Sequence, residues 1–181
     1  MPLSLLTGRR DVMSLLENDV FFFSTFGGEA LSLAAAMATI NVMKSEPVIK
    51  HLSRQGRRLR SGIESILRGL GEEGIHCQGY DCRTLLSFDP RLGDPLHLKS
   101  LVQQELIKRG ILWGGIHNIS YSHTDEDIDY AIEAYAQVLP LVRAAAARGN
   151  VLESLRGRPL APVFRRLSGF NTRPRAIAAT R

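Results

Sequence analysis

Hydrophobic residues along the middle of the chain recur with two different spacings, which predict a mixture of helices and short strands. Between residues 48 and 70 the apolar positions follow a helical period, and arginines fill many of the positions between them. Residues 96–108 and 128–142 show the same spacing. Thr124 precedes the last segment and Asp127 stands three positions later, a pair that is typical of a helix N-terminus.

Short runs of strand-forming residues lie between these helices. The predicted strands cover residues 75–80, 83–89, 111–113 and 118–121. The resulting order is helix, two strands, helix, two strands, helix. Because the connections are short, we expect one small sheet with helices packed on it, an α+β layer.

The N-terminal part predicts a different arrangement. Residues 9–16 favour a short helix, and residues 20–23 read as a short buried strand. Gly27 and Gly28 then allow a turn, and an alanine-rich helix is expected over residues 29–44. A helix with such small side chains can approach another element closely, so we expect it to be buried against a neighbour.

The connection between this strand and this helix is the first candidate site. Ser24 and Thr25 place two hydroxyls beside a helix start, and Glu29 falls in its first turn. Hydroxyls and free N–H groups at such a place can hold an anion such as phosphate. An ordinary strand, turn and helix joined by two glycines accounts for the same residues, and the pattern alone favours this simpler interpretation.

The net charge of +5 suggests nucleic-acid binding until its location is considered. Residues 150–181 carry seven arginines against one acidic residue, whereas the rest of the chain carries 16 basic and 17 acidic residues. The basic character therefore belongs to a tail, which we expect to be disordered from Leu167 onward, and we expect no nucleic-acid partner. No secretory signal or membrane-spanning run is evident. We expect a cytoplasmic chain in which Cys77 and Cys82 are thiols, and a disulfide between them is the alternative that the sequence leaves open.

Isolated polar residues give little further chemistry. His117 and His123 can share one face of a strand, but no third ligand stands at a suitable spacing, so structural or surface roles are favoured. The acidic cluster at residues 125–129 lacks the glycine and closing glutamate of a calcium loop and lies where a helix N-terminus favours acids. We therefore predict no metal site.

Six blocks of the chain carry a further signal: residues 1–13 (MPLSLLTGRRDVM), 24–36 (STFGGEALSLAAA), 110–112 (GIL), 117–120 (HNIS), 123–129 (HTDEDID) and 159–166 (PLAPVFRR). In consistent order they resemble class III pyridoxal-phosphate-dependent aminotransferases. The first block is similar to the segment that follows the cofactor lysine, the second to the phosphate-contacting motif, and the others to the C-terminal domain and the family ending. The Gly-Gly-Glu form is closer to the glutamate-1-semialdehyde aminomutase-like branch.

The resemblance implies a fold type I enzyme that moves amino groups with pyridoxal 5'-phosphate. It divides the chain into the last elements of the large α/β domain (residues 1–44), a small α+β domain (45–149) and a basic tail (150–181). By the same resemblance Thr25 matches the threonine that binds the cofactor phosphate of the neighbouring subunit in a homodimer, with Ser24, Phe26 and Gly27 beside it. The expected substrate is a small amino acid or amino-aldehyde.

The sequence departs from the family at the Schiff-base lysine, which is expected just before Met1. None of the four lysines stands in the family's lysine context, so no catalytic residue is assigned. Two hypotheses follow: amino transfer by the parent enzyme, as aminotransferase or aminomutase, or a non-catalytic fragment that acts as a dimerisation or binding module. A fragment would also leave residues 21–23 as exposed apolar surface. The lysines are Lys44, Lys50, Lys99 and Lys108.

Overall fold

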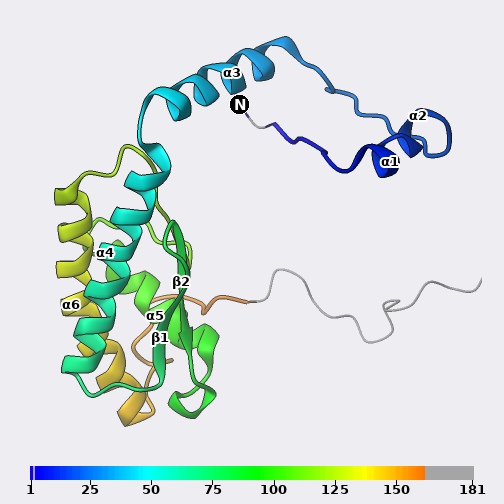
Figure 1. Ribbon diagram of the computed structural model, residues 1–181. Helices are drawn as coiled ribbons and strands as arrows, with labels where there is room; N and C mark the ends of the chain where they lie inside the picture. The colour runs from blue at the N-terminus through cyan, green and yellow to red at the C-terminus, as the bar shows by residue number, and fades with distance from the viewer. Residues whose placement is uncertain (2, 162–181) are drawn as a thin grey trace, which may run out of the picture. The chain divides into compact units, whose positions relative to one another are not determined.

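The computed structural model describes Met1 and residues 3–161 (Figure 1). The chain forms two compact units, Met1–Arg54 and Gln55–Arg181. The predicted division at residues 44 and 149 stays a prediction. The expected disorder beyond Leu167 falls outside the described residues.

The first unit contains the short helices α1 (Arg10–Met13) and α2 (Leu15–Asn18) and the longer α3 (Ala30–Ser45). The helix predicted over residues 9–16 is thus two short helices. The strand predicted over residues 20–23 is wrong, because Phe21–Ser24 forms no regular element. A strand needs a partner for its backbone hydrogen bonds, and the described part of the chain offers none here.

Helix α3 is present where its alanines predicted it, but none of its residues is buried. Met37 remains 66% exposed and Leu31 60% exposed, so the expected burial against a neighbour is not met within the described chain. The preceding phenylalanines are also exposed, Phe21 by 91% and Phe23 by 74%. The predicted exposure of this apolar segment is therefore confirmed.

The second unit is built on a three-stranded antiparallel sheet in the order β1-β2-β3. Strands β1 (Ile75–Tyr80) and β2 (Arg83–Phe88) form the predicted hairpin, with Ile75 opposite Phe88. The third strand, β3, covers only Ile116–Asn118, earlier than the predicted 118–121.

The strand predicted over residues 111–113 is wrong, and its hydrogen bonds show why. The Ile111 N–H donates to the Leu106 carbonyl at 3.0 Å and so belongs to a helix end. The Trp113 carbonyl accepts from Gln103 Nε2 at 2.9 Å, while its side chain is buried in the core. Helix packing uses these groups instead of a strand partner.

Three long helices cover one face of this sheet: α4 (Val48–Gly69), α5 (Pro95–Ile107) and α6 (Asp125–Arg148) (Figure 1). A short 3₁₀ helix, η1 (Pro90–Leu92), precedes α5. Helix α4 starts at Val48, where the helical spacing begins, and Ser45 is the last residue of α3. Alternate strand residues such as Ile75, Cys77 and Leu86 point into the core, so an α+β layer is confirmed.

The helix starts follow local rules. Asp94 caps α5 by accepting from the Leu96 N–H at 2.7 Å. Thr124 and Asp127 form the predicted capping box at the start of α6, and Gly149 ends that helix in a left-handed conformation. Cys77 and Cys82 are free thiols. No helix within the described residues is long and apolar enough to cross a membrane.

Gly56 brings α4 into contact with the turn between β1 and β2. A Cβ atom added at Gly56 would lie 1.6 Å from the Asp81 carbonyl oxygen. Such an overlap forces the backbone apart, because the obstructing atom is main chain. The close contact of helix and hairpin therefore requires glycine at this position.

We predict that Gly56→Ala lowers the free energy of unfolding by about 2 kcal/mol, since the clash outweighs the higher helix propensity of alanine. Gly69→Ala is the matched control, because an added Cβ there has no neighbour within 4 Å. Urea unfolding followed by circular dichroism measures both. Equal stability of the two variants would contradict the packing argument.

A buried polar chain runs through the core of this unit. His117 lies opposite Thr84 in the sheet, and its Nδ1 is hydrogen bonded to Thr84 Oγ1 at 2.9 Å. Its Nε2 is hydrogen bonded to the Tyr135 hydroxyl of α6 at 2.7 Å. Burial lowers the pKa of His117 to about 4, so the imidazole is neutral near pH 7. One ring nitrogen then donates and the other accepts.

This buried histidine predicts acid sensitivity. The unfolded chain binds a proton at His117 near pH 6.5, whereas the folded chain does so near pH 4. The unfolded state therefore holds more protons between these values, and stability falls as the pH drops through that window. We expect a loss of about 3 kcal/mol from this group between pH 7 and pH 4.

Urea midpoints at pH 7 and pH 4 measure the effect. His117→Gln should lose less stability over this range than the natural chain. His76→Gln is the control, because His76 lies on the exposed face of β1 and its loss should leave the pH dependence intact. A His117→Gln variant with the natural pH dependence would show that another group is responsible.

Candidate functional site

The candidate site of the first unit is a turn over Thr25–Gly28 that leads into α3. The Gly27 N–H donates to the Ser24 carbonyl at 3.2 Å, and the Glu29 N–H donates to the Phe26 carbonyl at 3.3 Å. Gly28 has a φ of 77°, a conformation that side chains other than glycine disfavour. The two glycines therefore have the predicted role of reversing the chain before the helix.

Glu29 differs from its predicted place. It is the N-cap of α3 and not a first-turn residue, and its carboxylate accepts from the N–H groups of Leu31 at 2.8 Å and Ser32 at 2.7 Å. Hydrogen bonds from Ser32 and Leu31 lower the pKa of the Glu29 carboxyl. Two of the helix-start N–H groups that sequence reasoning offered to an anion are thus already occupied.

A cavity of about 550 Å³ lies beside this turn. Ser24, Phe26 and Gly27, all predicted site residues, line it. Thr25 is exposed in the same turn but is not among the lining residues. The structure thus brings three of the four predicted residues to one cavity but does not place Thr25 in its wall.

Two further hydroxyls line the cavity, those of Ser4 and Ser32. Sequence reasoning missed Ser4 because it lies 20 positions before Ser24 with no periodic relation to it. Ser32 could have been found, since it stands three positions after Glu29 on the same helix face. Hydroxyl donors around a glycine turn suit a phosphate group, whereas the ionised Glu29 carboxylate, which also lines the cavity, opposes an anion.

The two histidines that the sequence offered as a metal pair have different hydrogen-bond partners in the structure. His117 makes the core hydrogen bonds described above, whereas His123 Nδ1 accepts from the Ser120 N–H at 3.0 Å. Among the described residues no group of three histidine, cysteine or acidic side chains is arranged to hold a metal. Asp127, from the acidic cluster, serves as a helix cap.

The arginines of α4 have protein partners. Arg57 and Arg60 reach the two oxygens of Asp81 at 3.1 and 2.6 Å, and Arg58 lies 2.6 Å from Asp129. These pairs give three of the arginines along α4 a protein partner, without any ligand. Surface pairs of this kind add little stability.

Known proteins are similar to this chain over most of its length. A glutamate-1-semialdehyde 2,1-aminomutase of Methanocella arvoryzae is 34% identical over 160 residues, which cover 79% of this chain and 37% of that protein. A 3-aminobutyryl-CoA aminotransferase of Cloacimonas acidaminovorans is 26% identical over 141 residues, covering 76% of this chain and 34% of that protein. The chain thus spans little more than a third of these relatives' length. No family model matches it.

Solved structures agree in fold. A transaminase with bound pyridoxal phosphate superposes with a TM-score of 0.67 at 17% identity, covering 77% of this chain and 35% of that structure. An omega-transaminase from Sphaerobacter thermophilus gives a TM-score of 0.63 at 20% identity, covering 75% and 34%. The α+β unit is therefore the fold of the small domain expected from the resemblance. Its sequence likeness and this shared fold together place the chain in the class III family of pyridoxal-phosphate-dependent aminotransferases.

Proposed function

We propose that this chain is part of an enzyme that uses pyridoxal 5'-phosphate to move an amino group on or between small molecules. The observation that carries the proposal is the 34% identity to a glutamate-1-semialdehyde 2,1-aminomutase over 160 residues. The second relative's name also denotes an amino-group transfer. The substrate is accordingly a small amino acid or amino-aldehyde, and the reaction is that of an aminomutase or a transaminase.

Thr25 is the residue to which we assign the cofactor phosphate. Thr25 is exposed, and a threonine hydroxyl can donate to a phosphate oxygen. Ser24, in the cavity wall, supplies a second hydroxyl. Phe26 and Gly27 shape the wall beside them. When bound, the cofactor supplies an aldehyde that takes up the amino group and a pyridine ring that withdraws electrons from the reacting carbon.

A homodimer is part of this proposal. Within the described chain the segment around Phe21 and Phe23 and the face of α3 leave large apolar side chains uncovered. Contact with a second subunit would cover such a surface. It would also allow Thr25 to reach a cofactor held by that subunit.

The Schiff-base lysine, in our proposal, is not one of the four lysines present. Lys108 Nζ is 2.5 Å from Glu105 Oε1, and the Lys99 side chain lies against Gly115. An ion-paired or packed ammonium is a poor nucleophile for an aldehyde. The alternative function is a non-catalytic dimerisation or binding module, which the exposed α3 favours.

We predict that Thr25→Ala weakens pyridoxal phosphate binding by the full chain about tenfold, the usual cost of one hydrogen bond to a charged group. Equilibrium dialysis measures the affinity. Thr25→Ser should retain it, because the hydroxyl remains. Thr39→Ala is the control, since Thr39 Oγ1 donates to the Ala35 carbonyl within α3. Unchanged affinity in Thr25→Ala would remove Thr25 from the site.

Trapping with borohydride tests the lysine assignment and separates the two functions. After incubation with pyridoxal phosphate and reduction, peptide mapping should show no stoichiometric adduct at Lys44, Lys50, Lys99 or Lys108. Full modification of one specific lysine would show that the chain carries its own catalytic lysine. It would also exclude the non-catalytic module.

A further inference from the structure

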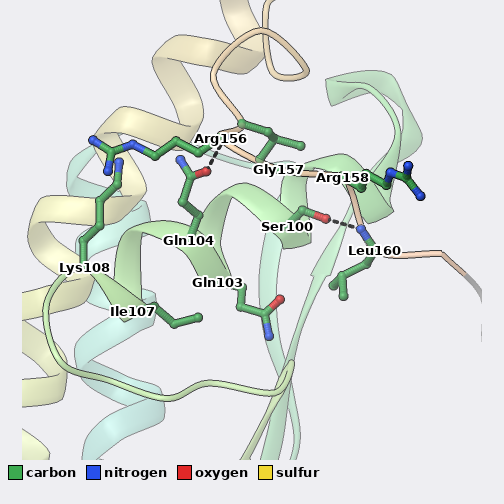
Figure 2. Close-up of a pocket in the computed structure, with 10 residues that line it drawn as sticks. Ser100, Gln103, Gln104, Ile107, Lys108, Arg156, Gly157, Arg158 and Leu160 are labelled. Atoms are coloured by element: carbon green, nitrogen blue, oxygen red, sulfur yellow. Dashed lines mark hydrogen bonds between the residues drawn. The ribbon is translucent and has the colours of Figure 1, made fainter.

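A second pocket lies in the α+β unit, far along the sequence from Thr25, between α5 and the segment that follows α6 (Figure 2). Its volume is about 390 Å³, within the range of small-molecule sites. Helix α5 supplies Gln103, Gln104 and Ile107, and Lys108 follows at its C-cap. Leu155–Leu160 closes the other side, so we call these residues the C-terminal strap.

Two side chains of α5, the half-buried Gln104 and the buried Ser100, hold the strap at both ends. Gln104 Oε1 accepts from the Arg156 N–H at 2.7 Å, and Gln104 Nε2 donates to the Ser154 carbonyl at 3.0 Å. Ser100 Oγ accepts from the Leu160 N–H at 2.8 Å, and Ser100 is only 8% exposed. Figure 2 shows the Gln104 and Ser100 contacts. These hydrogen bonds fix the backbone that forms the pocket. A ligand would therefore lose little binding free energy to the ordering of this segment.

The middle of the strap has open space beside its backbone. Gly157 lies between the two anchored ends, and a Cβ added there would meet no atom within 4 Å. Its backbone can thus be approached closely from the pocket side. The apolar part of the wall comes from Ile107, Leu155 and Leu160.

The charged side chains of the pocket are all positive. Lys108, Arg156 and Arg158 line it, and no acidic side chain of the described residues does so. Lys108 pairs with Glu105 at 2.5 Å, but the same carboxylate also pairs with Arg109 at 3.2 Å. The single negative charge of Glu105 is thus shared by two cations. The positive charges of Arg156 and Arg158 are not paired with any described carboxylate.

The guanidinium groups lie at different edges of the pocket. Figure 2 shows the Arg156 side chain extending to the same side as Lys108, and the Arg158 side chain extending to the other. Arginine binds phosphate through paired N–H groups, and lysine adds a point charge. A phosphate monoester carries a charge near −2 at pH 7, which matches the excess positive charge here.

We propose that this pocket binds a small phosphate monoester, with its phosphate between Arg156 and Lys108 and its carbon body against Ile107, Leu155 and Leu160. Arg158 adds attraction from the opposite edge. The site is separate from the Thr25 turn in the sequence and uses none of its residues. It does not depend on the function proposed above.

Titration of the ¹⁵N-labelled full chain with phenyl phosphate, followed by NMR, tests the proposal. The amide signals of Gly157 and Arg158 should shift to saturation, because the ligand approaches the strap. Inorganic phosphate should shift the same signals with weaker affinity, since it lacks an apolar body. Benzoate has a similar body but a single charge, and binding as tight as that of phenyl phosphate would contradict a phosphate site.

Single variants assign the site to its cations. Arg156→Gln and Arg158→Gln should each weaken phenyl phosphate binding, Arg156→Gln by about tenfold. Both side chains are exposed, so unchanged signals from β1 and β2 should show that the fold is retained. Arg68→Gln removes the same charge from an exposed position outside the pocket and should have no effect.

A variant of the Thr25 turn provides the last control. Thr25→Ala should leave the Gly157 response intact, whatever its effect on pyridoxal phosphate. Loss of that response in Thr25→Ala, or an equal weakening in Arg68→Gln and Arg156→Gln, would overturn the proposal. Absence of any shift at Gly157 with phenyl phosphate would also overturn it.

Discussion

The hydrogen bonds of His117 join three elements that the rest of the α+β unit depends on. Thr84 of β2 and Tyr135 of α6 hold the two ring nitrogens of a residue on β3, at 2.9 and 2.7 Å. Strand β3 is only three residues long, so its own ladder contributes little. The buried polar chain fixes its register, since a slip of one residue would turn His117 to the exposed face.

The apolar core forms around this chain because the sheet has one buried face. Helices α4, α5 and α6 bring Ile63, Leu98 and Leu139 to it, each fully buried. Gly56 allows the closest approach of helix and hairpin. The first unit shows the opposite condition, since α3 buries none of its residues within the described chain. The chain spans about a third of the length of the relatives it matches.

The two candidate sites rest on different kinds of geometry. The Ser24–Thr25 turn is local, and its hydroxyls, glycines and capping glutamate all lie within six residues. The cationic pocket is formed by tertiary contacts, with Gln104 and Ser100 holding a strap more than 50 residues away. A local site can be found from a motif and compared with a family. A site between distant segments is visible only once they are packed together.

The sequence by itself determined the elements whose hydrogen bonds and caps are local. It located α5, α6 with its capping box, and the β1–β2 hairpin, because helical periods and turns are encoded by neighbouring residues. It also identified the family and the Thr25 turn, which stays a predicted site. Tertiary structure alone decided which apolar segments become strands. Residues 20–23 found no strand partner, and residues 111–113 gave their backbone groups to α5. The Glu29 cap of α3 is local, since its carboxylate accepts from N–H groups two and three positions on. Tertiary structure also decided that His117 is a core residue and that Arg156 and Lys108 face one pocket, because these depend on contacts that spacing along the chain does not specify.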